Sequence, residues 1–276
     1  IAGGEGDVNI IGEGSIKRSL QEAREDKDVK AIVLRVNSPG GSALTSELIW
    51  REVEITKKVK PVVVSMGNYA ASGGYYISAN ADRIFAEPNT ITGSIGVFGM
   101  LPNMNQLGKN IGINAEQVKT HENASGYSVF EPIDENFKGF VLESIEKTYA
   151  TFLKRVADGR KMTTAQVDAI AQGRVWTGVD AHKLGLVDEI GGLDAAIQYA
   201  AKLGKTTSYR TENFPEYEKS FEDLLANFTG MAMFKTKEQL LKEQLGEEGF
   251  QMLEQIKRVK SRKGIQAIMP YEIVIN

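Results

Sequence analysis

The chain alternates short apolar runs with amphipathic stretches over its first 204 residues. The apolar runs predict strands at 31–36, 61–66, 82–86, near 95–100 and 113–119. The stretches with helical spacing predict helices at 15–27, 43–59, 72–80, 103–110, 134–158, from the Thr-Thr-Ala-Gln cap near 163, and 193–203. Strands that alternate with helices favour an α/β fold with a mainly parallel sheet and crossover helices.

Finer features of the pattern give further expectations. The apolar positions of the helix at 43–59 predict core contacts for Leu44, Leu48, Ile49, Val53 and Ile55. The loop 120–133 has no period and is rich in Ser, Gly and Asn, which predicts a mobile segment. The stretch WTGVDAHKLGLVDEIGG predicts a turn, a helix, a turn, a strand and a last turn.

The last 72 residues differ from the rest of the chain. They are strongly charged, with helical patterns at 216–226 and 236–260 and an extended end, YEIVIN. We therefore expect two parts, a domain over residues 1–204 and a mainly helical appendage over 205–276. The appendage is expected to serve assembly, by packing on another copy or another domain.

Composition excludes several classes of function. The 276 residues carry a formal charge of −3 with both signs interspersed, so a nucleic-acid partner is not expected. There is no cysteine and there are only two histidines, which argues against thiol chemistry, a metal site or another cofactor. No apolar run approaches the roughly 20 residues that span a bilayer. The Gly-rich start without Met suggests a fragment, soluble by itself, of a longer protein that carries an anchor upstream.

The stretch PVVVSMGNYAASGGYYI places Ser72 between a strand and a helix. Small neighbours let a substrate backbone approach this position, and the free N–H groups of a helix start favour negative charge there. Ser72 is therefore a candidate nucleophile of a hydrolase, although a serine at such a place, taken alone, is more often an ordinary helix cap. A second strand, AIVLRVNSPGG, also ends in a Gly-rich turn, whose exposed amides at Gly40 and Gly41 could stabilise an oxyanion. Asn37 and Ser38 are expected to shape that turn.

These motifs resemble the signal peptide peptidase A (protease IV) family, which belongs to the larger ClpP/crotonase-fold group. NSPGG, NYAASGGYYIS and TITGSIGVFG occur in the family's order, and the similarity continues through YATFLKRVADGRKMT and IAQGRVWTGVDAHKLGLVDEIGGLDAAI, over residues 8–204. The resemblance implies a ClpP/crotonase-like fold and a serine endopeptidase with a Ser–Lys dyad. Ser72 takes the role of nucleophile, Gly40 and Gly73 those of oxyanion donors, and Ser94 orients the lysine amine.

The general-base lysine itself is not found where the family pattern puts it. In single-domain members it follows the serine by about fifty residues, and here Tyr127 stands at that place. Lys119 is a weak candidate within the chain, and His121 and His182 lack the context of a Ser-His-Asp triad. In two-repeat members the lysine lies in the N-terminal repeat. The chain therefore resembles a C-terminal repeat whose base comes from a missing N-terminal repeat, so that the fragment alone is expected to be inactive.

The resemblance also implies partners and a location. The substrates are expected to be peptides, in particular cleaved signal peptides with small or apolar residues at the cleavage position. The full-length protein is expected to form a ring or bowl such as a tetramer, anchored in the inner membrane with the catalytic part on the periplasmic side. Two alternatives remain, namely a non-catalytic assembly domain and a crotonase-type acyl-CoA enzyme. The latter is weakened by the lack of Asp and Glu between Gly67 and Ala81.

Overall fold

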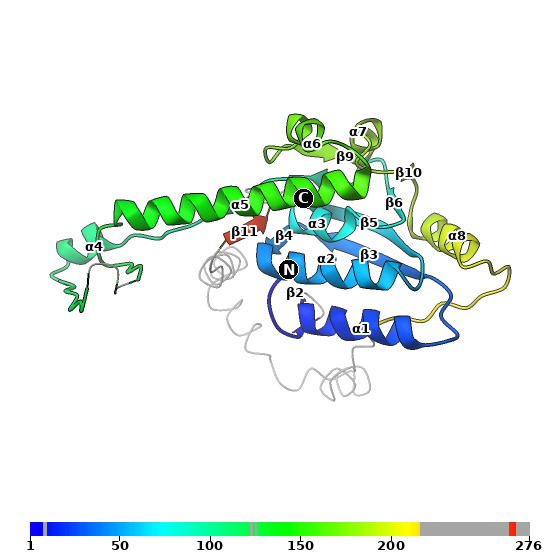
Figure 1. Cartoon of the computed structure of the whole chain (residues 1–276), viewed down its shortest axis with the longest axis horizontal. Helices are drawn as coiled ribbons and strands as arrows, with labels where there is room; N and C mark the ends of the chain where they lie inside the picture. The colour runs from blue at the N-terminus through cyan, green and yellow to red at the C-terminus, as the bar shows by residue number, and fades with distance from the viewer. Residues whose placement is uncertain (8–9, 122–123, 125, 216–264, 269–276) are drawn as a thin grey trace, which may run out of the picture.

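The centre of the fold is a twisted sheet built around one long strand, β5 (Val62–Ala71) (Figure 1). The computed structural model describes residues 1–7, 10–121, 124, 126–215 and 265–268. Strand β3 (Ile32–Ser38) pairs with β5 along one side. On the other side β5 pairs first with β6 (Arg83–Ala86) and then with β7 (Ile91–Gly93). All three of these pairings are parallel, so the sheet is parallel at its centre.

Two short strands extend this sheet away from β3. Strand β10 (Glu189–Ile190) adds to β6 in parallel, and β9 (Val175–Thr177) adds to β7 in the antiparallel direction. The predicted α/β class with a mainly parallel sheet is therefore confirmed.

Helices cover both faces of the sheet, as a parallel sheet requires. One face carries α1 (Glu13–Glu25), α2 (Ala43–Lys57), α3 (Gly73–Ser78) and α5 (Glu135–Arg160), which pack on Val62, Val64 and Met66 of β5. The opposite face carries α8 (Leu193–Leu203), whose Ala196 and Ala200 contact Val63 of β5. Successive side chains of β5 point to opposite faces of the sheet, and helices cover both faces. The strand is therefore an almost unbroken apolar run.

The remaining elements are short. They are β1 (Gly6–Asp7), β2 (Ile10–Ile11), β4 (Gly40–Ser42), β8 (Phe98–Gly99), α4 (Asn105–Asn110), α6 (Thr164–Ile170), α7 (Gly178–Lys183) and β11 (Ile265–Ile268). Helix α6 begins with a reciprocal capping box between Thr163 and Gln166, as its sequence predicts. Strand β11 pairs with β4 and with β8 in the antiparallel direction, which forms a second, three-stranded sheet.

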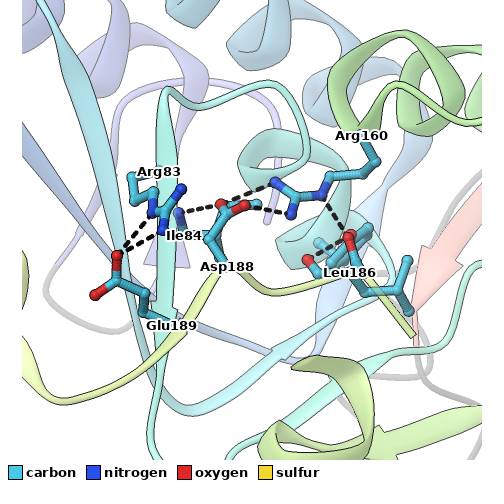
Figure 2. Close-up of polar contacts among 8 residues, drawn as sticks. Arg83, Ile84, Arg160, Leu186, Asp188 and Glu189 are labelled. Atoms are coloured by element: carbon cyan, nitrogen blue, oxygen red, sulfur yellow. Dashed lines mark hydrogen bonds and ion pairs between the residues drawn. The ribbon is translucent and has the colours of Figure 1, made fainter. Parts of the chain in front are cut away.

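The long helix α5 reaches well beyond the sheet and carries α4 near its far end (Figure 1). We call residues 100–142 of this projection the arm. Several large apolar side chains of the arm are exposed, among them Leu107, Ile111, Val118 and Phe140. The other end of α5 is held firmly in the domain, because Arg160 forms a bidentate ion pair with Asp188 (2.7 and 3.0 Å), beside the pair of Arg83 and Glu189 (Figure 2).

Some sequence-based expectations were wrong. Residues 113–119 form no strand, since they lie exposed on the arm and find no strand to pair with in the described part of the chain. Leu44 and Leu48 are exposed by 70% and 43%, because the core stripe of α2 runs through Ile49, Trp50 and Val53 instead. The strand expected near 95–100 shrinks to β8, outside the main sheet. The strand-like pattern before Ser94 forms β7, whereas β4, β9 and β11 were not predicted. The helices expected in the tail lie outside the described residues.

Candidate active site

Ser72 lies in the turn between the end of β5 and the start of α3, where its backbone is strained. Its dihedral angles are φ 51° and ψ −114°, a region that non-glycine residues rarely occupy and that costs roughly 1–3 kcal/mol. The Ser72 side chain is buried and makes no capping hydrogen bond to α3, so it is not an ordinary helix cap. In the described part of the chain its hydroxyl is within hydrogen-bond reach only of the Gly96 carbonyl, at a long 3.5 Å.

Ser94 occupies an equivalent place on the neighbouring strand. Ala71 and Gly93 are parallel partners in β5 and β7, so each serine is the first residue after one of two paired strands. The Ser72 amide donates to the Gly93 carbonyl at 2.8 Å. Ser94 is also buried and also has a positive φ of 47°. The fold therefore brings together two serines that are 22 residues apart in the sequence, each held in a strained turn.

The Gly-rich turn after β3 lies beside them. Asn37 accepts a hydrogen bond from the Tyr69 amide at 3.1 Å, and Ser38 Oγ accepts one from the Gly40 amide at 3.1 Å. Both side chains thus shape the turn, as the sequence predicts. Gly40 and Gly41 have φ values of 113° and 155°, which only glycine adopts without strain.

Gly73 lies where this turn, α2 and β11 meet. A Cβ at Gly73 would stand 2.6 Å from Ser46 Oγ, 3.0 Å from the Ala267 carbonyl oxygen and 3.2 Å from the Gly41 nitrogen. The residue after Ser72 must therefore lack a side chain. The register of β11 places Ala267 opposite Gly41, and Ala267 is completely buried. Strand β11 thus lies between β4 and β8 and close to Gly73, and we call the space that its backbone fills there the groove beside Ser72.

Helix α3 is anchored by two tyrosines that follow Ser72. Tyr75 donates to the Leu186 carbonyl at 2.8 Å, and Tyr76 donates to Glu47 at 2.6 Å. Burial, followed by the hydrogen bond to Glu47, raises the pKa of Tyr76, so its phenol remains a donor. Glu47 is in turn paired with Arg155, which stacks on Trp50 with its guanidinium 3.8 Å from the ring centre. These contacts fix the start of α3.

The candidate bases within the chain do not fit this site. Lys119 is exposed on the arm. Tyr127 is also on the arm, where it stacks on Phe137 and donates to the Pro102 carbonyl. His182 is exposed on α7, and His121 is exposed beside Thr120.

Two other kinds of feature are absent from the described residues. No helix there is long and apolar enough to cross a membrane. Nor do His, Asp and Glu side chains gather there in groups of three that could hold a metal ion.

Sequence reasoning missed two features of the site. One is β11, which comes from a charged tail with no recognisable strand pattern of its own. The other is Ser46, whose contact at Gly73 depends on how α2 and α3 pack. The sequence did give one signal for Ser46, which lies in α2 four residues after the cap residue Ser42. At this spacing the Ser46 hydroxyl donates a hydrogen bond to the Ser42 carbonyl, at 2.9 Å.

Comparison with known proteins identifies relatives of this chain. The chain is 48% identical over 204 residues to "Protease 4" of Haemophilus influenzae, which covers 74% of this chain and 33% of that protein. It is 41% identical over 192 residues to "Serine protease SPPA, chloroplastic" of Arabidopsis thaliana, which covers 69% of this chain and 28% of that one. The chain thus spans about a third of the length of these relatives.

A solved structure of a ClpP1 mutant from Listeria monocytogenes is also similar. Its TM-score is 0.45 at 14% identity, and the match covers 67% of this chain and 86% of that one. The profile of "Peptidase family S49" matches residues 54–207, a range that begins in α2, contains both Ser72 and Ser94, and ends just after α8. Since this range is more than half of the chain, the chain belongs to peptidase family S49.

Proposed function

We propose that this chain supplies the nucleophile and the oxyanion donors of a serine endopeptidase that uses a Ser–Lys dyad. The observation that carries the proposal is Ser72 itself, a buried serine whose strained backbone leaves its hydroxyl free of α3. Strain of this kind persists only where the surroundings enforce it, and it is concentrated at functional sites. Ser72 Oγ attacks the peptide carbonyl, and a lysine amine takes its proton.

The oxyanion is stabilised by the amides of Gly73 and Gly40. The Gly40 amide donates a hydrogen bond to Ser38 Oγ at 3.1 Å, so it has to leave this hydroxyl in order to donate to the oxyanion. A charged oxygen is a stronger acceptor than a neutral hydroxyl, which favours that exchange as the tetrahedral intermediate forms.

The lysine is proposed to come from an N-terminal repeat outside this chain. The two relatives named above are each more than twice as long as this chain, which leaves room for such a repeat. Within the described residues, no amine or imidazole lies within hydrogen-bond distance of Ser72 Oγ. Ser94 would orient the incoming amine, since its turn is adjacent to that of Ser72.

The substrates are proposed to be extended peptides, in particular cleaved signal peptides. Strand β11 supports this class, because it occupies the groove beside Ser72 by pairing with β4 and β8 through its backbone. Peptides that bind by adding a strand use main-chain hydrogen bonds in the same way. The buried Ala267 indicates that this groove takes a small residue next to Gly41.

We further propose that the full-length protein assembles into a ring or bowl, with the exposed apolar side chains of the arm as the contact surface. Residues 205–276 are proposed as a separate appendage that contributes β11 to the groove. A membrane-anchored protein with its catalytic part outside the cytoplasm agrees with the family resemblance and with the absence of cysteine.

The nucleophile and the role of β11 can be tested together by labelling with a serine-directed fluorophosphonate. The probe should form an adduct on Ser72, identified by mass spectrometry of peptides. Shortening the chain to end at Gly264 should make labelling roughly tenfold faster, since the lost strand hydrogen bonds are worth about 1 kcal/mol each. Ala267→Trp, which is too large for the buried position, should act in the same direction without a truncation. An adduct on another serine, or no adduct together with tight acyl-CoA binding, would favour the crotonase alternative.

Ser94→Ala in the full-length protein should lower peptide hydrolysis by about one to two orders of magnitude, because misplacing a general base loses only part of the 10²–10⁴-fold that it supplies. The pH profile should shift as well, since the hydroxyl is proposed to contact the amine. A rate and a profile like those of the wild type would remove Ser94 from the site.

A further inference from the structure

Strand β3 has one free edge. Its Ile32 amide donates to the Pro61 carbonyl, which precedes β5, at 2.9 Å. Successive residues of a strand point their backbone groups to opposite sides, so the N–H and C=O groups of Val33 and Arg35 point away from β5. No strand pairs with that side of β3 in the part of the chain that the structure describes. These groups are left open on a strand whose apolar sequence is typical of the interior of a parallel sheet.

A groove of about 560 Å³ runs along this free edge. Helix α1 contributes Leu20 from one face of the sheet, and α8 contributes Ile197 and Ala201 from the other. The segment 208–214 forms the wall opposite β3, where the chain returns from α8 toward α1 (Figure 1). The groove therefore has the walls that a buried strand would need, with a strand edge on one side and apolar helices above and below.

The direction of a strand in this groove follows from Ile1. The Ile1 nitrogen donates to the Gly40 carbonyl at 2.8 Å, and the Ser42 amide donates to the Ile1 carbonyl at 3.0 Å. In a parallel strand pair, one residue forms hydrogen bonds to the two residues that flank its partner. Ile1 forms such bonds to Gly40 and Ser42, so it is the parallel partner of Gly41. Only Pro39 separates the end of β3 from β4, so backbone that leads into Ile1 would come from alongside β3.

We propose that this groove takes an extended, apolar strand of the full-length protein, which leads into Ile1 and lies parallel to β3. Both faces of such a strand would be buried, one against α1 and the other against α8, so its sequence should be a nearly continuous apolar run. Because β3 leads directly into the turn at Gly40, this strand would also hold the oxyanion turn in place. The proposal does not depend on the identity of the base or of the substrate.

Hydrogen exchange at single amides tests the proposal. The 276-residue chain is compared with a chain extended by the ten residues that precede Ile1 in the full-length protein. The Val33 and Arg35 amides should exchange at least tenfold more slowly in the extended chain, while the Leu34 amide, which faces β5, should be equally protected in both. If Val33 and Arg35 are as slow as Leu34 in the 276-residue chain, the groove is filled from within this chain. If they stay fast in the extended chain, the strand lies elsewhere. Either result overturns the proposal.

A pair of variants in the extended chain separates the groove from general stability. Ala201→Trp fills the groove from α8 and should abolish the added protection of Val33 and Arg35. Gln198→Trp puts the same side chain on an exposed position of that helix and should leave the protection intact. Protection of Leu34 in both variants shows that the sheet is still folded. Full protection of Val33 and Arg35 in the Ala201→Trp variant would contradict the proposal.

Discussion

Ser72→Ala in the full-length protein should reduce peptide hydrolysis by roughly four to six orders of magnitude, since the loss of a covalent nucleophile leaves only binding and oxyanion stabilisation. The fold should survive, because in the described chain the Ser72 hydroxyl contributes only one long contact, to the Gly96 carbonyl. Alanine fits the space of serine and keeps the backbone of the turn. The hydrogen bond that the Tyr76 amide donates to the carbonyl of residue 72, at 2.8 Å, is therefore retained. Initial rates with a fluorogenic peptide and a thermal unfolding curve measure the two effects separately.

The matched control is Ser78→Ala. Ser78 is a second buried serine of α3, and its hydroxyl bonds to the Gly74 carbonyl of the same helix at 2.7 Å. Losing that hydroxyl removes one local hydrogen bond but no chemistry, so the rate should stay within about threefold of the wild type while stability falls by about 1 kcal/mol. Substantial activity in Ser72→Ala would eliminate Ser72 as the nucleophile. A comparable loss of activity in both variants would mean that any change in α3 disrupts the site, and that the loss in Ser72→Ala says nothing about a nucleophile.

The part of the site that the sequence could predict is the part encoded locally. Ser72 follows the long apolar strand β5 and Ser94 follows the short strand β7, each with glycine beside it, and such strand ends meet at one edge of a parallel sheet. The family resemblance suggested that the two serines belong to one site, whereas the pairing of Ala71 with Gly93 is seen only in the structure. The Gly40 turn was predictable from its own residues, since NSPGG allows few conformations other than a tight turn.

What the sequence could not predict depends on long-range pairing. Strand β11 is a strand only because β4 and β8 lie on either side of it, more than 160 residues away in the chain. The segment 113–119 shows the opposite failure. It contains Ile113 and Val118, which favour a strand, yet both are exposed on the arm, where no described strand is within reach. Strand propensity describes a fit to neighbours, and here the neighbours are missing.

The missing base leads to the second large effect. The 276-residue chain alone should hydrolyse peptides at a rate close to background, because a serine without a base is a poor nucleophile near pH 7. Adding the remainder of the full-length protein, either joined to the chain or as a separate fragment, should raise turnover by roughly two to four orders of magnitude. Slow labelling by an activated ester or fluorophosphonate should persist in the chain alone, since the donors at Gly73 and Gly40 remain.

The pH dependence of the restored activity identifies the base. A lysine must lose its proton to accept one from Ser72, so the rate should rise with pH and level off above the pKa of the buried amine. Replacing the corresponding lysine of the added half by alanine should return turnover to that of the chain alone. Lys119→Ala is the matched control, an exposed lysine on the arm that should change neither the rate nor the profile. Hydrolysis by the chain alone at the full-length rate would place the base within these 276 residues and contradict the proposal that it comes from another repeat. The variants Lys119→Ala and His121→Ala would then show which residue is the base.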